Sequence, residues 1–230
     1  MTRRLSLSAA ALAVTLASLP LSAGAVTATD VAKCLRDKIV SQWQVQNLQV
    51  SVTPYSQTET DRGRFKSVSV RADSATRSGL ALKPMWVKGS DVIFDLHKLF
   101  GAEVSVQTPY RGGTEMYVEM NEQDLNEGLR MAQKVVPDLN ASLQNGLITL
   151  TGTYKFVVGN KFKMAGKLSV PDGYKINFVP TSCKVNGIPI PVSGVKLLLS
   201  KLNPILDLSE VIMKPRINSI TIADGKIVVK

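Results

Sequence analysis

Hydrophobic residues first recur at helical spacing in residues 29–43, TDVAKCLRDKIVSQW. Thr29 or Asp30 is available there to cap the free backbone N–H groups at a helix start. One side of this helix collects Val31, Cys34, Leu35, Ile39 and Trp43. The pattern predicts an amphipathic helix over residues 29–43.

Two later segments show the same spacing. Residues 122–136 follow the capping candidate Asn121 and stop at Pro137. One face of that helix carries Leu125, Leu129, Ala132 and Val136. Residues 195–208, VKLLLSKLNPILDL, form a stripe, and Pro204 inside the pattern predicts that the helix ends just before it. The stripe consists of Val195, Leu198, Leu199, Leu202, Ile205 and Leu206.

Elsewhere the period drops to two, as in a strand with one buried face. In residues 65–72, Val68, Val70 and Ala72 alternate with polar positions. Strands are also predicted at residues 112–120, 147–158, 161–170, 174–179, 217–223 and 226–230, with a helical turn at 96–100. Gly159-Asn160 and Asp224-Gly225 are the predicted hairpin turns. Many antiparallel strands with about three amphipathic helices indicate an α+β fold.

The strands between residues 147 and 179 have an apolar side and a basic side. The apolar side comprises Ile148, Leu150, Phe156, Phe162, Met164 and Phe178. The basic side comprises Lys155, Lys161, Lys163, Lys167 and Lys175. A basic side of this kind either meets anionic lipid headgroups at a membrane surface or is a solvated outer face.

The N-terminus has the layout of a secretory signal peptide. Arg3 and Arg4 precede a small and apolar run from Leu5 to Leu21, which closes on Ala23-Gly24-Ala25. We expect cleavage after Ala25, so that residues 1–25 are a signal peptide and residues 26–230 form a single domain; a retained membrane anchor is the alternative. No later segment has the roughly 18 apolar residues of a membrane span. We therefore expect a periplasmic or extracellular protein associated with the cell envelope.

Basic residues outnumber acidic ones. The chain of 230 residues has 28 Lys and Arg against 18 Asp and Glu, a net charge of +10 at pH 7, and loss of Arg3 and Arg4 lowers it by two. Such a balance favours an anionic partner, whether a membrane surface, a polyanion or an acidic lipid headgroup, and a basic but inert surface is the alternative. Export disfavours a nucleic-acid partner.

Cys34 and Cys183 are the two cysteines of the chain. In an oxidising compartment we expect them to pair in a disulfide if the fold brings them together, and two buried free thiols are the alternative. No metal site is expected, because no cysteine pair has ligand spacing and His97 is the single histidine.

Catalytic and cofactor motifs are missing from the sequence. No serine lies in a nucleophile elbow, and phosphate loops and dinucleotide fingerprints are absent, so we expect neither an enzyme nor a cofactor. An acidic run is typical of a solvated turn and a helix start, where negative charge suits the helix dipole. It consists of Glu115, Glu119, Glu122 and Asp124.

The order of several segments resembles the LmeA-like phospholipid-binding family of small exported bacterial proteins. The segments are GRFKSVSVRADSATRSGLALKPMWVKGSDVIFDL, EMYVEMNEQDLNEGL, LQNGLITLTGTYKF, VNGIPIPVSGVKLLLSKLNPILDLS and INSITIADGKIVV. The likeness runs from Phe65 to Lys230 and departs from the family pattern at residues 53–63, TPYSQTETDRG. It implies a tubular lipid-binding-like fold, in which a curved antiparallel sheet wraps amphipathic helices and leaves an apolar cavity for acyl chains. No catalytic motif comes with the family.

An acyl chain needs a dry concave surface, because enclosing apolar area stabilises by about 25 cal/mol per Å². The predicted lining is Leu125, Leu129, Ile148, Leu150, Phe156, Phe162, Met164, Phe178, Leu198, Leu202 and Ile205, with plain core packing as the alternative for each. Headgroup or membrane-surface candidates are Lys155, Lys161, Lys163, Lys167 and Lys175. Trp43 and Trp86 lie either at a cavity mouth or in the core.

These observations favour an exported envelope protein that encloses phospholipid acyl chains for transfer, sequestration or envelope maintenance. Its expected partner is a phospholipid or another acyl lipid, with transient contact at a membrane surface. The alternative is a non-catalytic structural or adaptor domain that docks through its basic face on anionic envelope polymers or on a partner protein. An enzyme that acts on envelope lipid ranks third.

Overall fold

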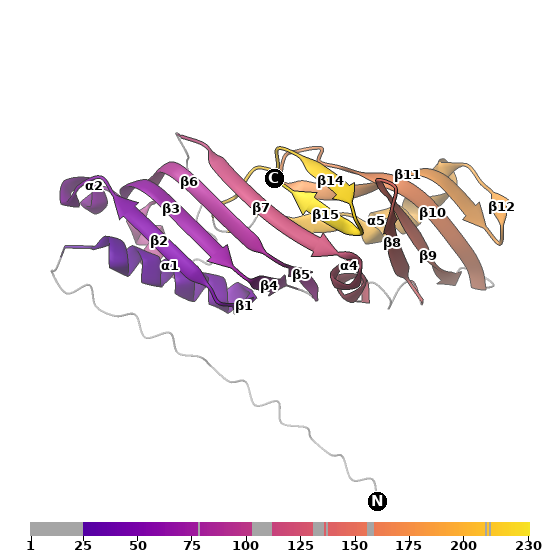
Figure 1. The fold of residues 1–230 in the computed structure, drawn as a ribbon, viewed down its shortest axis with the longest axis horizontal. Helices are drawn as coiled ribbons and strands as arrows, with labels where there is room; N and C mark the ends of the chain where they lie inside the picture. Colours follow the sequence, from indigo (N-terminus) through magenta and orange to yellow (C-terminus); the bar gives the residue numbers. More distant parts are fainter. Residues whose placement is uncertain are drawn as a thin grey trace, which may run out of the picture.

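The structure is a computed structural model of the chain. It describes residues 25–77, 79–102, 112–130, 136, 138–155, 159–209, 211 and 213–230, with the backbone alone at 154, 155, 159, 197, 198 and 201. Most of the described chain forms antiparallel strands, which lie in two six-stranded sheets and one three-stranded sheet. Figure 1 shows the two larger sheets side by side along an elongated molecule.

The first sheet lies in the N-terminal half of the molecule and is completed by the last two strands of the chain. Its strand order is β14(Ile220–Ala223), β15(Lys226–Val229), β7(Thr114–Asn121), β6(Met85–Ile93), β3(Arg64–Ala72) and β2(Gln49–Pro54). Helix α1(Ala28–Gln42) packs along this sheet, and the short helices α2(Gln57–Asp61) and α3(Leu96–Phe100) lie near it (Figure 1). The three-stranded sheet is β1(Gln44–Gln46), β4(Ser74–Arg77) and β5(Leu80–Leu82).

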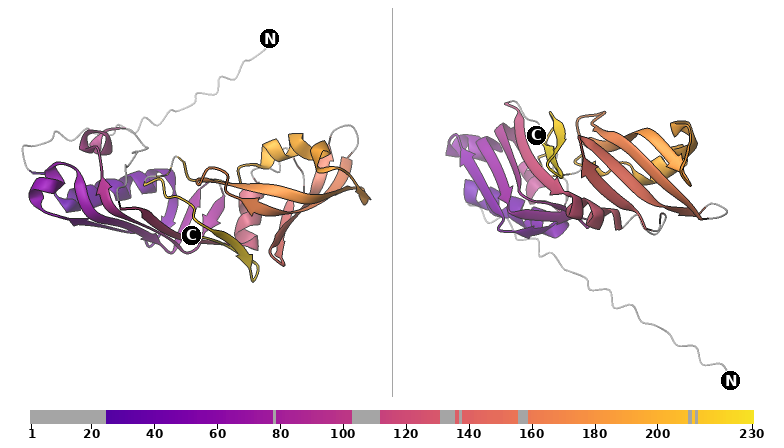
Figure 2. Two further views of the ribbon diagram at one scale, coloured as in Figure 1. Left: turned by 90° about the horizontal axis from the view of Figure 1, so that it is seen from above. Right: turned by 45° about the vertical axis from the view of Figure 1, so that its right-hand side comes forward.

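The second sheet forms the other half of the molecule. Its strand order is β12(Ile188–Pro189), β11(Lys175–Val185), β10(Gly159–Ser169), β9(Leu147–Lys155) and β8(Asn140–Gln144), and β13(Leu206–Asp207) pairs with β11. A 3-10 turn, Val192–Val195, leads into α5(Lys196–Leu202), and α4(Glu122–Leu129) lies where the two larger sheets meet (Figure 1). In the left view of Figure 2, α1 and α5 lie on the same side of their sheets.

Helix α1 begins one residue before the predicted range, and the predicted N-cap was wrong. Thr27 is the N-cap: its hydroxyl accepts from the Asp30 N–H, and the Asp30 carboxylate accepts from the Thr27 N–H. This capping box satisfies two helix-start donors together, which Thr29 or Asp30 alone cannot do. The apolar side was predicted correctly, since Val31, Leu35, Ile39 and Trp43 are buried, while Cys34 is half-buried.

Asn121 caps α4 as predicted, because its side chain accepts from the Asp124 N–H at 2.8 Å. The helix ends at Leu129, well before Pro137, and residues 131–135 lie outside the described residues. Pro204 ends the last helix as predicted, although α5 has only seven residues. The Asn203 side chain then donates to the Phe178 carbonyl at 3.0 Å and accepts from the Phe178 N–H at 2.9 Å, which fixes the helix end to β11.

The predicted turn at Gly159-Asn160 was wrong. Gly159 pairs with Lys155 and Asn160 with Tyr154 inside the β9–β10 ladder, so the connection lies at residues 156–158, outside the described residues. The Asp224-Gly225 turn between β14 and β15 was predicted correctly. The ladder between β10 and β11 has a bulge at Gly166, where a Cβ atom would lie 2.3 Å from the Val179 carbonyl oxygen, so only glycine fits.

The buried residues of both larger sheets and their helices belong to one hydrophobic core. This arrangement agrees with the predicted α+β class and with an antiparallel, curled sheet, although the strands divide among three sheets. Of the helices that the structure describes, none has both the length and the hydropathy needed to cross a bilayer.

Candidate functional site

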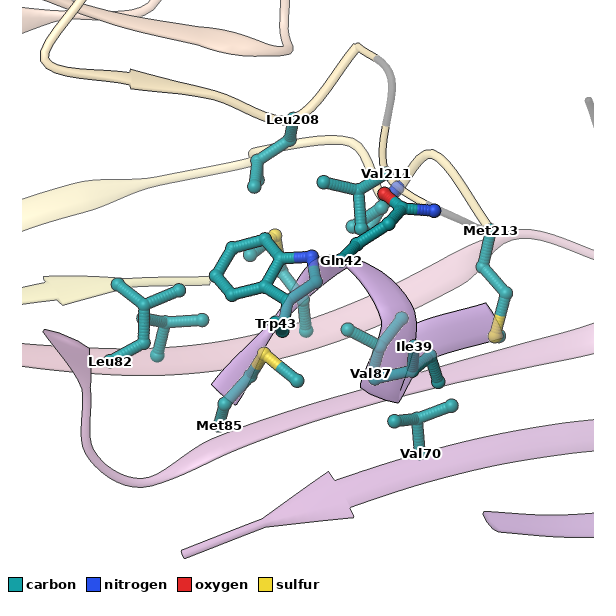
Figure 3. Close-up of a pocket in the computed structure, with 13 residues that line it drawn as sticks. Ile39, Gln42, Trp43, Val70, Leu82, Met85, Val87, Leu208, Val211 and Met213 are labelled. Carbon is teal, nitrogen blue, oxygen red and sulfur yellow. The ribbon is translucent and has the colours of Figure 1, made fainter. Parts of the chain in front are cut away.

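An apolar pocket lies between the end of α1, the inner face of the first sheet and the segment 208–215 (Figure 3). Its volume between atoms is about 570 Å³, including the side that is open to solvent. Its 13 lining residues are Ile39, Gln42, Trp43, Val70, Leu82, Met85, Val87, Met116, Val118, Leu208, Val211, Met213 and Pro215. Among the lining residues that the structure describes, the polar side-chain groups are the Gln42 amide and the Trp43 indole N–H, so the pocket suits an apolar ligand.

Three adjacent strands supply the floor of the pocket. Val70 of β3 lies directly opposite Val87 of β6, and Val87 lies opposite Met116 of β7. Directly opposite residues point to the same face of a sheet, so these side chains form a row across it. Methionine is flexible and polarisable, and the pocket has Met85, Met116 and Met213, which lets its wall adapt to ligands of different shape.

Trp43 forms the wall of the pocket at the end of α1. It is the C-cap residue, with extended backbone, and its N–H donates to the Ile39 carbonyl at 2.9 Å. Its indole is 8% exposed, and the Arg77 guanidinium lies over the ring at 5.7 Å. Figure 3 shows the indole between Leu82, Met85 and Leu208. The change from helix to strand at Trp43 therefore turns the indole into the pocket.

The opposite wall, which we call the strap, is formed by Leu208, Val211, Met213 and Pro215. It is anchored at both ends to the turn between β10 and β11: the Leu208 N–H donates to the Tyr174 carbonyl at 3.0 Å, and the Ile217 N–H donates to the Gly173 carbonyl at 2.8 Å. The Lys214 ammonium lies 4.7 Å from the centre of the Tyr174 ring. A turn of the second sheet thus positions a wall of the pocket over the first sheet.

Asp172 shapes that anchoring turn. Its carboxylate accepts from the Tyr174 N–H at 2.9 Å and from the Lys175 N–H at 2.8 Å. These backbone donors, Tyr174 first, hold the pKa of the Asp172 carboxyl below its usual value. Gly173 follows with φ 79°, and the Arg216 side chain packs where a Cβ would lie, so the position favours glycine.

Comparison with known protein families identifies the family of this chain. The model of the LmeA-like phospholipid-binding family matches residues 21–230, nearly the whole chain. The chain belongs to this family. A search of curated proteins found no match, and neither did a search of solved structures. The resemblance expected from the sequence is therefore confirmed, and an apolar pocket is the kind of site that a phospholipid-binding family needs.

The predicted lining residues of this LmeA-like chain lie elsewhere. Most are buried in the core, chiefly beneath the second sheet: Leu125, Leu129, Ile148, Leu150, Phe162, Met164, Phe178 and Leu202. Ile205 is half-buried against them. Phe156 lies outside the described residues, as does the Leu198 side chain. None of the predicted residues whose side chains are described lines the pocket at Trp43. Their contact with lipid stays a prediction.

Sequence reasoning found the pocket only through Trp43. The pattern marked Ile39, Val70 and Ala72 as buried positions, but a buried position and a pocket wall have the same periodicity. Only the packing of the strap against α1 distinguishes them. The other tryptophan, Trp86, lies on the outer face of the first sheet, where its ring stacks on Tyr117 at 6.2 Å.

The predicted basic side exists on the second sheet. Lys161, Lys163 and Lys167 are exposed, whereas Lys175 is half-buried with its ammonium 3.7 Å from the Asp207 carboxylate. The Lys155 side chain lies outside the description. Sequence reasoning missed Lys184, which lies directly opposite Lys163 and is exposed. Strict alternation from Ile176 and Phe178 would put Lys184 on the inner face. The register shift that skips Thr181 turns Cys183 inward and Lys184 outward, and no sequence signal marks that shift.

The predicted disulfide was wrong: Cys34 and Cys183 are free thiols. Cys34 lies on α1 and donates to the Leu99 carbonyl at 3.1 Å, whereas Cys183 lies on β11 opposite Met164. Figure 1 shows α1 and β11 in opposite halves of the molecule. Burial raises the pKa of both thiols, which disfavours the reactive thiolate.

Polar side chains outside the pocket form contacts that are typical of a structural role. The Glu119 carboxylate accepts from the Tyr117 hydroxyl and lies 3.0 Å from the Lys226 ammonium, and these bonds, Tyr117 first, lower its pKa. Glu122 accepts from the Leu143 N–H at 2.8 Å. His97 is exposed on α3. Within the described ranges, no group of three or more His, Cys, Asp or Glu side chains is placed to hold a metal ion.

Proposed function

We propose that this chain is an exported phospholipid-binding protein that takes an acyl chain into the pocket at Trp43, for transfer or sequestration of lipid at the cell envelope. The observation that carries the proposal is an almost wholly apolar pocket in a chain of a phospholipid-binding family. The signal-peptide layout of residues 1–25 supports export.

The pocket chemistry suits the tail of a lipid better than its headgroup. Each methylene buried in the pocket contributes about 0.8 kcal/mol to binding. The Gln42 amide and the Trp43 indole N–H are the polar side-chain groups among the described lining residues, so a charged headgroup stays outside. Under this proposal the two sheets, with α1 and α5 on one side, are the two ends of a tubular lipid-binding fold.

The two tryptophans give a direct test, because they lie on opposite sides of the first sheet. In W86F the remaining emission comes from Trp43 in the pocket, and in W43F it comes from Trp86 on the outer face. We expect a dispersed phospholipid brominated on its acyl chain to quench most of the emission of W86F and little of that of W43F. Bromine quenches only at close contact, so the difference locates the tail.

A second measurement uses the protein purified from the cells that export it. We expect organic extraction followed by mass spectrometry to show a co-purified phospholipid. Equal quenching of both variants would place the lipid elsewhere. The absence of quenching in both, together with no co-purified lipid, overturns the proposed function.

A further inference from the structure

We propose that the outer face of the second sheet docks on an anionic phospholipid bilayer. We call this surface the lysine face and define it by the exposed residues Lys161, Lys163, Lys167 and Lys184. The choice of a bilayer as partner rests on the proposed lipid-binding function. The surface itself rests on the separate observations that follow.

The strand register places these lysines on one face. Phe162 and Met164 of β10 are buried in the core with Phe178 and Cys183 of β11, so the alternating positions point outward. Lys163 lies opposite Lys184 on one side and Thr151 on the other, and Lys161 lies opposite Thr153. The lysines therefore stand among short side chains, where their ammonium groups are the most prominent features of the surface.

Within the described residues, the four lysines of the lysine face form no ion pair. The acidic group on this side of the sheet, Asp207 of β13, lies opposite Lys175 and 3.7 Å from its ammonium. Strands β8 to β12, as the structure describes them, contain neither Asp nor Glu. The first sheet differs, because Arg64 lies 2.9 Å from Asp91 and Lys226 lies 3.0 Å from Glu119. Like charges directly opposite each other, as at Lys163 and Lys184, destabilise a sheet. An external anionic surface removes that repulsion.

An exposed apolar residue on the lysine face favours a bilayer over a hydrophilic polymer. Val179 lies opposite Lys167 on this face and is 46% exposed. The interface of a membrane accepts apolar side chains beside basic ones, whereas a polyanion in water offers no apolar contact.

The expected contribution of each lysine is measurable. A basic residue near an anionic leaflet contributes about 1 kcal/mol, which is about fivefold in membrane partition. Removal of three such charges lowers partition on the order of a hundredfold. Salt weakens the attraction, because the Debye length falls from about 10 Å at 0.1 M to about 3 Å at 1 M.

The test is cosedimentation of the full chain with vesicles of phosphatidylglycerol and phosphatidylcholine in equal amounts, and with vesicles of phosphatidylcholine alone. The variant is K161Q/K163Q/K184Q. Its matched control is K66Q/R71Q/K88Q, which removes the same charge from exposed positions on the first sheet. Circular dichroism confirms that each variant is folded.

We expect the wild-type chain and the control to bind the anionic vesicles in a salt-sensitive manner, and the lysine-face variant to lose on the order of a hundredfold. V179S should lower binding severalfold. Equal loss in both triple variants would show that only net charge matters and overturns the proposal. Retention of dextran sulfate without recruitment to anionic vesicles also overturns it, since the surface then serves a polymer.

The lipid pocket is tested separately. Trp43 quenching by dispersed brominated lipid should be unchanged in K161Q/K163Q/K184Q made in the W86F background. Vesicle docking without quenching of either tryptophan, together with no co-purified lipid, would overturn the proposed function and leave the docking surface standing. Trp43 quenching without vesicle docking would overturn the docking surface and leave the proposed function standing.

Discussion

The two larger sheets both have an apolar inner face, and the chain covers these faces differently. Over the first sheet, α1 and the strap approach the valines and methionines of the sheet without filling the space between them. Under the second sheet, Phe162, Met164 and Phe178 are almost fully buried. The rings of Phe162 and Phe178 help to fill that interior, whereas the pocket floor over the first sheet consists of valine and methionine and keeps open space beneath the strap.

The outer faces of the two sheets differ in how their charged groups are paired. The first sheet pairs basic with acidic groups, at Arg64 and Asp91 and at Lys226 and Glu119. The second sheet has exposed lysines and no acidic residue in β8 to β12. The proposed lipid site thus lies on the inner side of one sheet, and the proposed membrane contact lies on the outer side of the other.

The largest expected effect comes from truncating a side chain on each inner face. Phe178 is 1% exposed, so F178A should lower the free energy of unfolding by about 3–5 kcal/mol. Met85 is half-buried beside existing space, so M85A should cost only about 1 kcal/mol. Urea denaturation of both variants measures the difference. Losses of equal size would show that the two interiors are equally well packed.

The second expected effect comes from filling the pocket. Val87 lines it, so V87F should place a ring where the acyl chain lies and weaken brominated-lipid binding about tenfold, or about 1.4 kcal/mol. Its stability should change little, because the ring enters open space. V68F is the matched control for stability: Val68 is fully buried outside the lining, and overpacking there should cost about 1–3 kcal/mol.

V179F controls the binding measurement, because it adds the same ring on the lysine face. It should leave Trp43 quenching unchanged. If V87F destabilises the fold as strongly as V68F does, the pocket is not the open space that the comparison requires.

The sequence predicted several strands of both sheets because periodicity reports burial directly, but it did not predict the edge strands β2 and β8. The alternation in β3, the capping residue Asn121 and the helix end before Pro204 all follow from local chemistry. The side of the second sheet that carries lysines was also predictable, since a strand has only two faces. Lys184 was not predictable in this way, because the register shift that skips Thr181 reverses the alternation between Phe178 and Cys183.

The position of the pocket was not predictable, because it depends on contacts between segments far apart in the sequence. Trp43 and Leu208 line the same pocket because the turn at Gly173 and Tyr174 holds the strap in place. The disulfide prediction failed for a related reason: Cys34 and Cys183 have no spacing that reports their separation in space. Apolar faces show which residues are buried, and tertiary packing decides whether space remains beside them.

The smallest expected effect tests whether a turn of the second sheet maintains the pocket of the first. The Asp172 carboxylate accepts from two backbone N–H groups, so its pKa is lowered in the folded state. The ionised Asp172 carboxylate therefore stabilises the fold fully above the ordinary Asp pKa of about 3.9. This stabilisation is lost as the pH falls through the lower pKa of the folded state. Wild type should therefore exceed D172A in urea midpoint at neutral pH, and the difference should shrink in acid. D172N, which keeps a neutral acceptor, should lie between them without this pH dependence.

Trp43 emission reports the same turn at the pocket. Loss of the Asp172 bonds loosens the anchor of the strap, so the indole of D172A should become more exposed and its emission should shift to longer wavelength. The shift should exceed that of D224A, which alters the exposed β14–β15 turn. Emission of D172A identical to that of the wild type would show that the strap holds its place without the turn, and that the two sheets are independent.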